Sequence, residues 1–350
     1  MNNNRILSID VFRSVTMVLM IWVNDFWTLK SIPKWLKHAL AEEDYLGFSD
    51  LIFPWFLFAM GLSIPFAVSN RLKKGETTGI IFKHIIFRSA ALITMGLFHM
   101  NMEMFNHEHS LIIKPVFVIL CTSAFFMIWN DYSDIIKQNN LLYNFLRFSG
   151  ILILFFMVFL FSGKDYNGSQ IGFKTHWWGI LGLIGWVYLI TSCAYLFIQN
   201  SIIGNMIAFF MCILLNIISS SGFAYNIFSW QGDQWIPGNG GLQALTFGGI
   251  IVSLLINKFE GKSNIKRRCI FLSGIGMIIF LGGLYLKNFF AISKIKGTPS
   301  WIFISLSSAI LFFVIIYWIV DEKGKFSWFE YINIAGTSTL TCYLIPYYYY

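Results

Sequence analysis

The sequence predicts an all-α polytopic membrane protein, a bundle of about eleven transmembrane helices that forms a single domain over residues 1–350. Of its 350 residues, 57% are hydrophobic and only 12% are charged, whereas a soluble domain has about 25% charged residues. The mean hydropathy is +0.66, and the apolar segments approach the ~20 residues that a helix needs to cross a bilayer. The alternating segments of about 10 residues that would indicate a membrane β-barrel are not seen in the sequence.

Eleven apolar segments are candidate spans. They cover residues 7–27, 51–69, 82–100, 112–129, 142–162, 179–198, 202–220, 242–257, 269–286, 300–320 and 332–350. The first follows "MNNNR" and lacks a small-x-small cleavage site, so we expect an uncleaved span and not a signal peptide. Every loop between the segments is short, and no soluble domain is expected. The last segment must begin near Tyr331, or the chain continues past Tyr350, because a start at Gly336 gives only about 21 Å of helix.

The net charge of +8 has a topological explanation. Lys and Arg gather in short loops, above all in "RLKKGE" (71–76) and "KSNIKRR" (262–268), and cytoplasmic loops collect these residues. Both clusters fall on one face of the predicted topology, which favours a cytoplasmic N-terminus. We therefore expect the lipid bilayer as a partner and no nucleic acid.

No metal site is expected. The five cysteines are isolated and no CxxC occurs, so the sequence indicates neither a disulfide framework nor a zinc site. His107 and His109 form a His-x-His pair near Glu103, but no third histidine stands at ligand spacing. We interpret these three as solvated loop residues.

Charged residues inside apolar segments cost roughly 2.5–3.5 kcal/mol on insertion, so each needs a reason. Asp10 and Arg13 stand three residues apart on one face of the first span. They fit either a mutually neutralising pair at the interface or a cytoplasmic anion site. Arg88 lies inside the third span. Asn24 ends the first span, either as an interfacial cap or as a polar group that points into the bundle.

His38 follows the amphipathic stretch "SIPKWLKHAL" (31–40), between the first two spans and outside the cell on the favoured topology. Asp44 and Asp50 come closely after it, and Pro54 loosens the start of the second span, so that its polar beginning can face a cavity. An imidazole titrates near neutral pH and can act as base or nucleophile, while a neighbouring carboxylate fixes its tautomer. The alternative is a plain interfacial histidine.

Several segments resemble the family of heparan-alpha-glucosaminide N-acetyltransferase and its bacterial relatives of the DUF5009 type. They are "RILSIDVFRSVTMVLMIWVN" (5–24), "KHA" (37–39), "DLIFPWFLFAMGLSI" (50–64), "RSAALITMGLFHMN" (88–101) and "AGTSTLTCYL" (335–344). The resemblance is dense over about 100 N-terminal residues and thinner afterwards.

This resemblance implies a transmembrane acyltransferase domain that takes an acetyl group from acetyl-CoA on one side and gives it to a glucosamine amine on the other. In the family, the histidine of the "KHA" segment is assigned as the active-site residue, and His38 matches it. Asn24 matches the asparagine that ends the first span, and Asp50 the aspartate that opens the second. The resemblance also implies the inner membrane of a bacterium; a homodimer is left open.

Two segments depart from the family pattern. The link "HALAEEDYLGFSD" (38–50) is two residues longer than the family's, acidic, and lacks its Trp. The fourth span begins "LIIKPVFVILCTS" (111–123), where relatives carry a different sequence. Both departures leave the identity of the acceptor open.

Two functions are compatible with these residues. In an acyltransferase, His38 would deprotonate the sugar amine or accept the acetyl group itself, with Asp50 orienting it and Asn24 polarising the thioester carbonyl. The phosphates of acetyl-CoA would meet cations of the cytoplasmic half, namely Arg13, Arg71, Lys73, Lys74 and Arg88. The alternative is an inner-membrane permease for amino sugars of the N-acetylglucosamine or N-acetylmuramic acid type. Aromatic-rich spans suit sugar stacking, but no internal symmetry of a transporter is visible.

Overall fold

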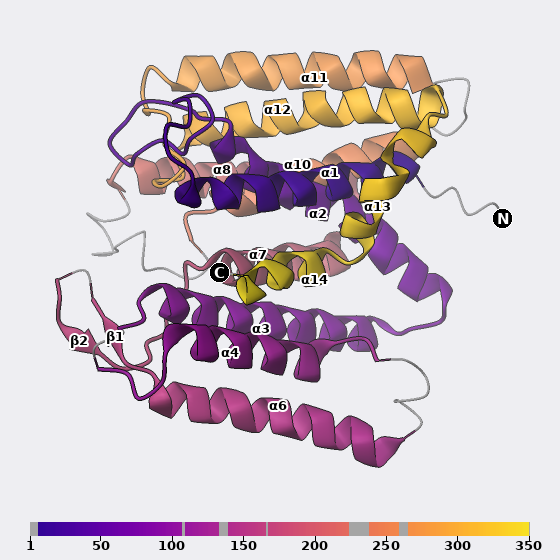
Figure 1. The fold of residues 1–350 in the computed structure, drawn as a ribbon. Coiled ribbons are helices and arrows are strands. Elements are labelled where there is room, and N and C mark those ends of the chain that lie inside the picture. The colour runs from indigo at the N-terminus through magenta and orange to yellow at the C-terminus, as the bar shows by residue number, and fades with distance from the viewer. Residues whose placement is uncertain are drawn as a thin grey trace. The chain divides into compact units, whose positions relative to one another are not determined.

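The computed structural model describes residues 6–106, 109–132, 139–165, 167–223, 238–258 and 265–349. In these ranges, 9 helices are long and apolar enough to cross a membrane (Figure 1). They are α1 (Leu7–Asn24), α2 (Ser49–Lys73), α3 (Thr78–Glu103), α6 (Asn140–Leu160), α7 (Ile180–Ile198), α8 (Ile202–Ser220), α10 (Gly241–Lys258), α11 (Ile265–Leu286) and α12 (Pro299–Tyr317), the last continued by a π-helical turn over Trp318–Glu322. The predicted all-α polytopic membrane protein is confirmed.

The count of eleven spans is not confirmed. The apolar helix α4 (Lys114–Trp129) has 16 residues, about 24 Å of helix, short of the ~30 Å core of a bilayer. The last predicted span is broken into α13 (Glu330–Thr337), α14 (Thr339–Leu344) and a 3₁₀ turn over Ile345–Tyr348.

The break falls at Ser338, where φ is −118° and ψ is 43°. Ser and Thr side chains compete for backbone hydrogen bonds and weaken a helix, and the Thr337 hydroxyl donates to the Ile334 carbonyl at 3.0 Å. The remaining regular elements are two 3₁₀ turns, Asp25–Thr28 and Phe326–Phe329, and a hairpin of β1 (Gly163–Lys164) and β2 (Gln170–Ile171), in which Gly163 is paired with Ile171.

The chain divides into two compact units, each described here by itself. The first holds Met1–Ile85 and Val187–Cys342, and the second holds Ile86–Trp186 and Tyr343–Tyr350. Helices α3 and α7 contribute residues to both. The interpretation of residues 1–350 as one domain stays a prediction.

The core of the first unit is the packing of α2 against α10, α12 and α1. Phe12, Phe58 and Phe313 are fully buried and meet edge to face, with ring centroids 5.6–6.2 Å apart. Between α2 and α10 a Cβ on Gly61 would overlap the Thr246 carbonyl. Packing in lipid depends on such close backbone approach, and it holds α2 in place.

In the second unit, α4 packs against α6, α3 meets α4 through the Phe98 and Phe125 rings, and the first turns of α7 meet α3. A Cβ on Gly96 of α3 would overlap the backbone of Gly182, so these helices also meet backbone to backbone. The buried His99 ring stacks on Tyr347 with centroids 4.2 Å apart.

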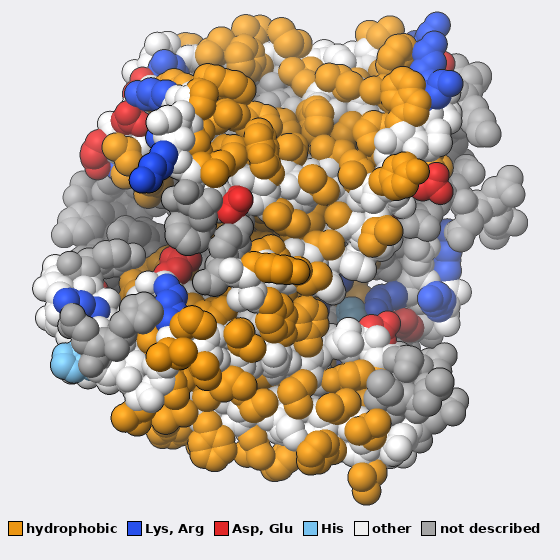
Figure 2. All heavy atoms as spheres, in the orientation of Figure 1, with side chains coloured by type: hydrophobic (Ala, Val, Ile, Leu, Met, Phe, Trp, Pro, Cys, Tyr) orange, Lys and Arg blue, Asp and Glu red, His pale blue; other side chains and the backbone are white. Residues whose placement is uncertain are grey.

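The outer faces of the helices are apolar. In the apolar 18-residue stretch of α6, only 17% is buried within the protein, and the share is 22% in the corresponding stretches of α8 and α11. Figure 2 shows hydrophobic side chains over the middle of the helices of the first unit (α11 and α12 at the top), with Lys, Arg, Asp and Glu side chains at the helix ends. This is the distribution expected for helices whose outer faces meet lipid.

Candidate functional site

Two connecting segments build the site at one end of the first unit. One is the α1–α2 link (residues 25–48), and the other is the α11–α12 loop (residues 287–298). Asp50 lies in the first turn of α2, immediately after the link, where the positive end of the helix dipole favours a carboxylate.

The carboxylate of Asp50 is almost fully buried, with 1% of the side chain exposed. Its Oδ2 accepts hydrogen bonds from the backbone N–H groups of Ala39 at 3.0 Å and Gly47 at 3.1 Å. Its Oδ1 lies 2.7 Å from Nδ1 of His38. Because both oxygens have partners, the carboxylate is fixed in one orientation.

This arrangement selects one tautomer of His38. An ionised carboxylate only accepts hydrogen bonds, so Nδ1 must carry the proton that it shares with Asp50. Nε2 then keeps its lone pair. Because 44% of the His38 side chain is exposed, this nitrogen can be reached by a substrate. The ring therefore has the form of a general base or a nucleophile.

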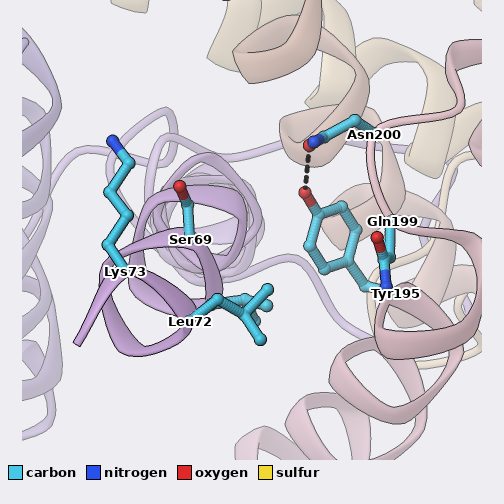
Figure 3. Close-up of a pocket in the computed structure, with 7 residues that line it drawn as sticks. Ser69, Leu72, Lys73, Tyr195, Gln199 and Asn200 are labelled. Carbon is cyan, nitrogen blue, oxygen red and sulfur yellow. Dashed lines mark hydrogen bonds between the residues drawn. The ribbon is translucent and has the colours of Figure 1, made fainter. Parts of the chain in front are cut away.

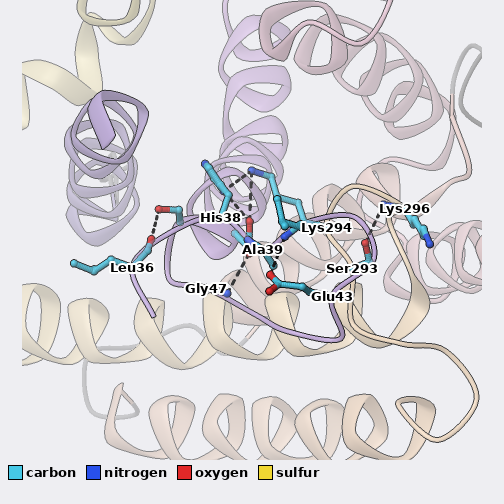
Figure 4. Close-up of polar contacts among 11 residues, drawn as sticks. Leu36, His38, Ala39, Glu43, Gly47, Ser293, Lys294 and Lys296 are labelled. Carbon is cyan, nitrogen blue, oxygen red and sulfur yellow. Dashed lines mark hydrogen bonds and ion pairs between the residues drawn. The ribbon is translucent and has the colours of Figure 1, made fainter. Parts of the chain in front are cut away.

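The site also holds a cation that the sequence did not indicate. Nζ of Lys294 lies 3.2 Å from Nδ1 of His38 and 3.9 Å from Oδ1 of Asp50 (Figure 4). Because Nδ1 carries the proton that points to Asp50, a Lys294 ammonium cannot donate to this nitrogen, and the contact is electrostatic and not a hydrogen bond. Its side chain is 27% exposed. Burial lowers the pKa of Lys294, and the Asp50 carboxylate opposes that shift by favouring the charged form.

Lys294 reaches the pair because the α11–α12 loop docks onto the α1–α2 link. The Asp44 carboxylate accepts from the Ile292 N–H at 2.8 Å and lies 3.6 Å from Lys287 Nζ. The Lys296 ammonium lies 3.1 Å from a Glu42 carboxylate oxygen. Residues 42–44 of the link are all acidic and the loop is basic, and this charge complementarity is the signal in the sequence that could have found Lys294.

The third predicted catalytic residue makes no hydrogen bond with the pair within the described part of the chain. Asn24 is exposed at the end of α1. Among the residues that the structure describes, no hydrogen bond joins it to His38 or Asp50. The structure thus brings together His38 and Asp50, and it does not join Asn24 to them; the catalytic roles of all three stay predictions.

The five predicted phosphate contacts come from α1, from the end of α2 and from α3. Arg13 pairs with Asp10 on α1 at 3.0 Å, and Arg71 contacts Glu76 at 2.7 Å and His84 at 3.0 Å. Lys73 and Lys74 are exposed where α2 ends, and Arg88 is exposed on α3, within the second unit.

Lys73 also lines a cavity of about 300 Å³ at the far end of α2 from Asp50 (Figure 3). Its lining residues are Val68, Ser69, Leu72, Lys73, Tyr195, Gln199 and Asn200. The Tyr195 hydroxyl donates to the Asn200 amide oxygen at 2.9 Å. An ammonium, two hydroxyls and two amides suit an anionic or polyhydroxylated ligand.

Metal ligands do not cluster in the part of the chain that the structure describes: no group of three or more His, Cys, Asp or Glu side chains is suitably placed. His107 of the predicted His-x-His pair lies outside the described residues. The expectation that no metal is bound stays a prediction.

Comparisons with known proteins place these residues in context. The model of the family DUF5009, a domain of unknown function, matches residues 5–247. The chain is 33% identical over 102 residues to heparan-alpha-glucosaminide N-acetyltransferase of Mus musculus, and 34% identical over 101 residues to that of Homo sapiens. Each match covers 28% of this chain and 14% of the curated relative, so the chain spans only a small part of the relatives' length.

Proposed function

The chain belongs to the DUF5009 family, and we propose that it is a membrane-embedded acyltransferase that moves an acetyl group from cytoplasmic acetyl-CoA to an amino sugar on the external side. The observation that carries the proposal is the pair of an exposed His38 ring and a buried Asp50 carboxylate, 2.7 Å apart. The similarity to two N-acetyltransferases over about 100 residues supports the same class of reaction.

His38 would supply the base. As the acceptor amine attacks the thioester carbonyl, Nε2 takes the proton that the amine loses, and the Asp50 carboxylate stabilises the imidazolium. The C–S bond breaks, the proton passes to the leaving thiolate, and the products are an N-acetyl sugar and free CoA. The same nitrogen could first accept the acetyl group, in which case the amine attacks acetyl-His38 in a second step.

Helix lengths support Arg13 as the cation that meets the phosphates of the donor. A phosphopantetheine arm of about 13 bonds, comparable to four extended residues, spans about 15 Å. Arg13 precedes the end of α1 by 11 residues, about 17 Å at 1.5 Å per residue. Lys73 lies 23 residues beyond Asp50, about 35 Å along α2. We therefore assign the phosphates to the level of Arg13, whereas a donor in the Lys73 cavity would not reach His38.

The orientation that we propose has the N-terminus in the cytoplasm of a bacterium and His38 on the external side of the inner membrane. In support, Lys73 and Lys74 end α2 and Arg267 and Arg268 begin α11, so both basic clusters lie at the opposite end of the first unit from His38. Cysteines introduced at Lys74 and Arg267 should be labelled only after cells are permeabilised. Labelling in intact cells would reverse the orientation.

The proposed function is tested with purified protein in vesicles. Labelled acetyl-CoA and glucosamine should give labelled N-acetylglucosamine. The permease alternative predicts instead that vesicles without any acetyl-CoA take up labelled N-acetylglucosamine or N-acetylmuramic acid. Uptake without acetyl transfer would refute the acyltransferase.

A further inference from the structure

We propose that Lys294 is a positioning residue that keeps the His38 ring electrically neutral, so that Nε2 remains available as a base. The proposal rests on the proposed acyl transfer for its purpose, although ring protonation can be measured without any substrate. Lys294 lies in the α11–α12 loop, beyond the residues 5–247 that the family model matches.

The argument starts from the buried carboxylate. Asp50 is 1% exposed and has His38 as its nearest ionisable neighbour. Alone, such an anion would favour the doubly protonated, positively charged ring, because an opposite charge within ~4–6 Å stabilises the charged form. An imidazolium has no lone pair and is no base.

Lys294 changes this balance. Its Nζ lies 3.9 Å from the Asp50 carboxylate and 3.2 Å from the His38 ring. The ammonium therefore compensates the anion and repels a second positive charge on the ring. With Lys294 charged, Asp50 ionised and His38 neutral, the cluster has no net charge, which suits a site that is partly withdrawn from water.

Three further ion pairs join charges of the two segments. The pairs are Lys34 with Glu43 at 3.0 Å, Lys296 with Glu42 at 3.1 Å and Lys287 with Asp44 at 3.6 Å. Among the described residues, the charged groups in contact with the His38 ring are Asp50 from α2 and Lys294 from the loop; Lys37 is its neighbour in the link.

The loop holds Lys294 at this position. The Ser293 N–H donates to the Thr298 hydroxyl at 3.1 Å, and the Ser293 hydroxyl donates to the Ala41 carbonyl at 3.3 Å. Ser293, which directly precedes Lys294, is thus tied both to the loop itself and to the link. The ammonium is delivered to the ring by anchored backbone and is not a chance contact of an exposed side chain.

The test measures the protonation of His38 directly. Diethylpyrocarbonate acylates neutral imidazole, and peptide mass spectrometry reports the extent at His38 between pH 5 and pH 9. The variants are Lys294→Met, which keeps the aliphatic stem, Lys294→Arg, which keeps the charge, and Lys296→Met as the control from the same loop. Thermal unfolding verifies that each variant is folded.

We expect half-maximal reactivity of Lys294→Met to require a pH at least about one unit higher than the wild type, a tenfold change in proton concentration. Lys294→Arg and Lys296→Met should follow the wild type. The proposal is overturned if Lys294→Met follows the wild type, or if Lys296→Met shifts equally. If the shift occurs but the wild type transfers no acetyl group, the positioning role stands and the proposed function fails.

Discussion

The His38 ring and the Asp50 carboxylate are 2.7 Å apart, yet one is 44% exposed and the other 1% exposed. The two groups therefore have different tasks. A buried anion held by two backbone N–H groups cannot meet a substrate, but it fixes the tautomer of its partner. The exposed ring carries the free nitrogen.

The first prediction concerns Asp50→Asn. The amide oxygen of the new side chain should accept the hydrogen bonds from the N–H groups of Ala39 and Gly47. Its NH₂ group then points toward Nδ1 of His38. Nδ1 must then accept, the proton moves to Nε2, and the base is lost. Acetyl transfer should fall by about 10²–10⁴-fold. Glu43→Gln, from the same link, should keep its activity; equal losses in both variants would contradict the tautomer argument.

The second prediction concerns Gly47, which donates to Asp50 and lies against the Lys37 carbonyl, with no room for a Cβ. Gly47→Ala should displace the segment that carries His38 and destabilise the protein by about 1–3 kcal/mol. Gly79→Ala, on α3, is the control because no atom lies within 4 Å of its Cβ position. Thermal unfolding in detergent compares the two. An unchanged melting temperature for Gly47→Ala would show that the link adapts.

The third prediction separates the two candidate levels for the phosphates of the donor. Arg13→Met should weaken acetyl-CoA binding by about tenfold or more, because a charge-assisted hydrogen bond is lost. Lys73→Met should bind almost as the wild type does. Asp10→Asn is the control for loss of the Asp10–Arg13 pair. Calorimetric titration gives each dissociation constant. A defect confined to Lys73→Met would place the donor in the cavity that Lys73 lines.

The fourth prediction concerns how the stability of the second unit depends on pH. Burial and the nearby Lys174 lower the pKa of His176 below its ordinary value of 6.5, although Asp165 opposes them. Below pH 6.5 the unfolded chain binds a proton that the folded chain does not, so stability falls as the pH drops through the folded pKa. His176→Phe keeps a ring against Trp178. Its melting temperature should fall less than that of the wild type between pH 7.5 and pH 5.5. Equal losses would mean that other groups cause the dependence.

The sequence predicted most of the helices because hydropathy reports burial in lipid directly. The span expected at 202–220 is α8, and the one at 300–320 is α12 with its π-helical turn. The prediction of one continuous helix over 332–350 was wrong, because the segment is broken at Ser338. Average hydropathy does not register how Ser and Thr side chains compete for backbone hydrogen bonds.

The site could be predicted only in part. The residue pattern and the family resemblance both indicated His38 and Asp50, and the geometry of their contact came from the structure. Lys294 is 256 residues from His38 in sequence, and no local pattern connects residues at that distance. The acidic link and the basic loop are complementary, and the acidity that departs from the family pattern at Glu42 and Asp44 has its partners in that loop.

The most direct test of the central claim is acetyl transfer by His38→Ala, measured beside its binding of acetyl-CoA. An exposed ring contributes little packing, so the stability of the variant should change by less than about 1 kcal/mol. Binding of the donor should be retained, because Arg13 lies about 17 Å along α1 from the end of the helix that leads into the link with His38. We expect the transfer of labelled acetyl to glucosamine to be abolished. Transfer at the wild-type rate by a folded His38→Ala protein would contradict the account and leave His38 as an interfacial residue.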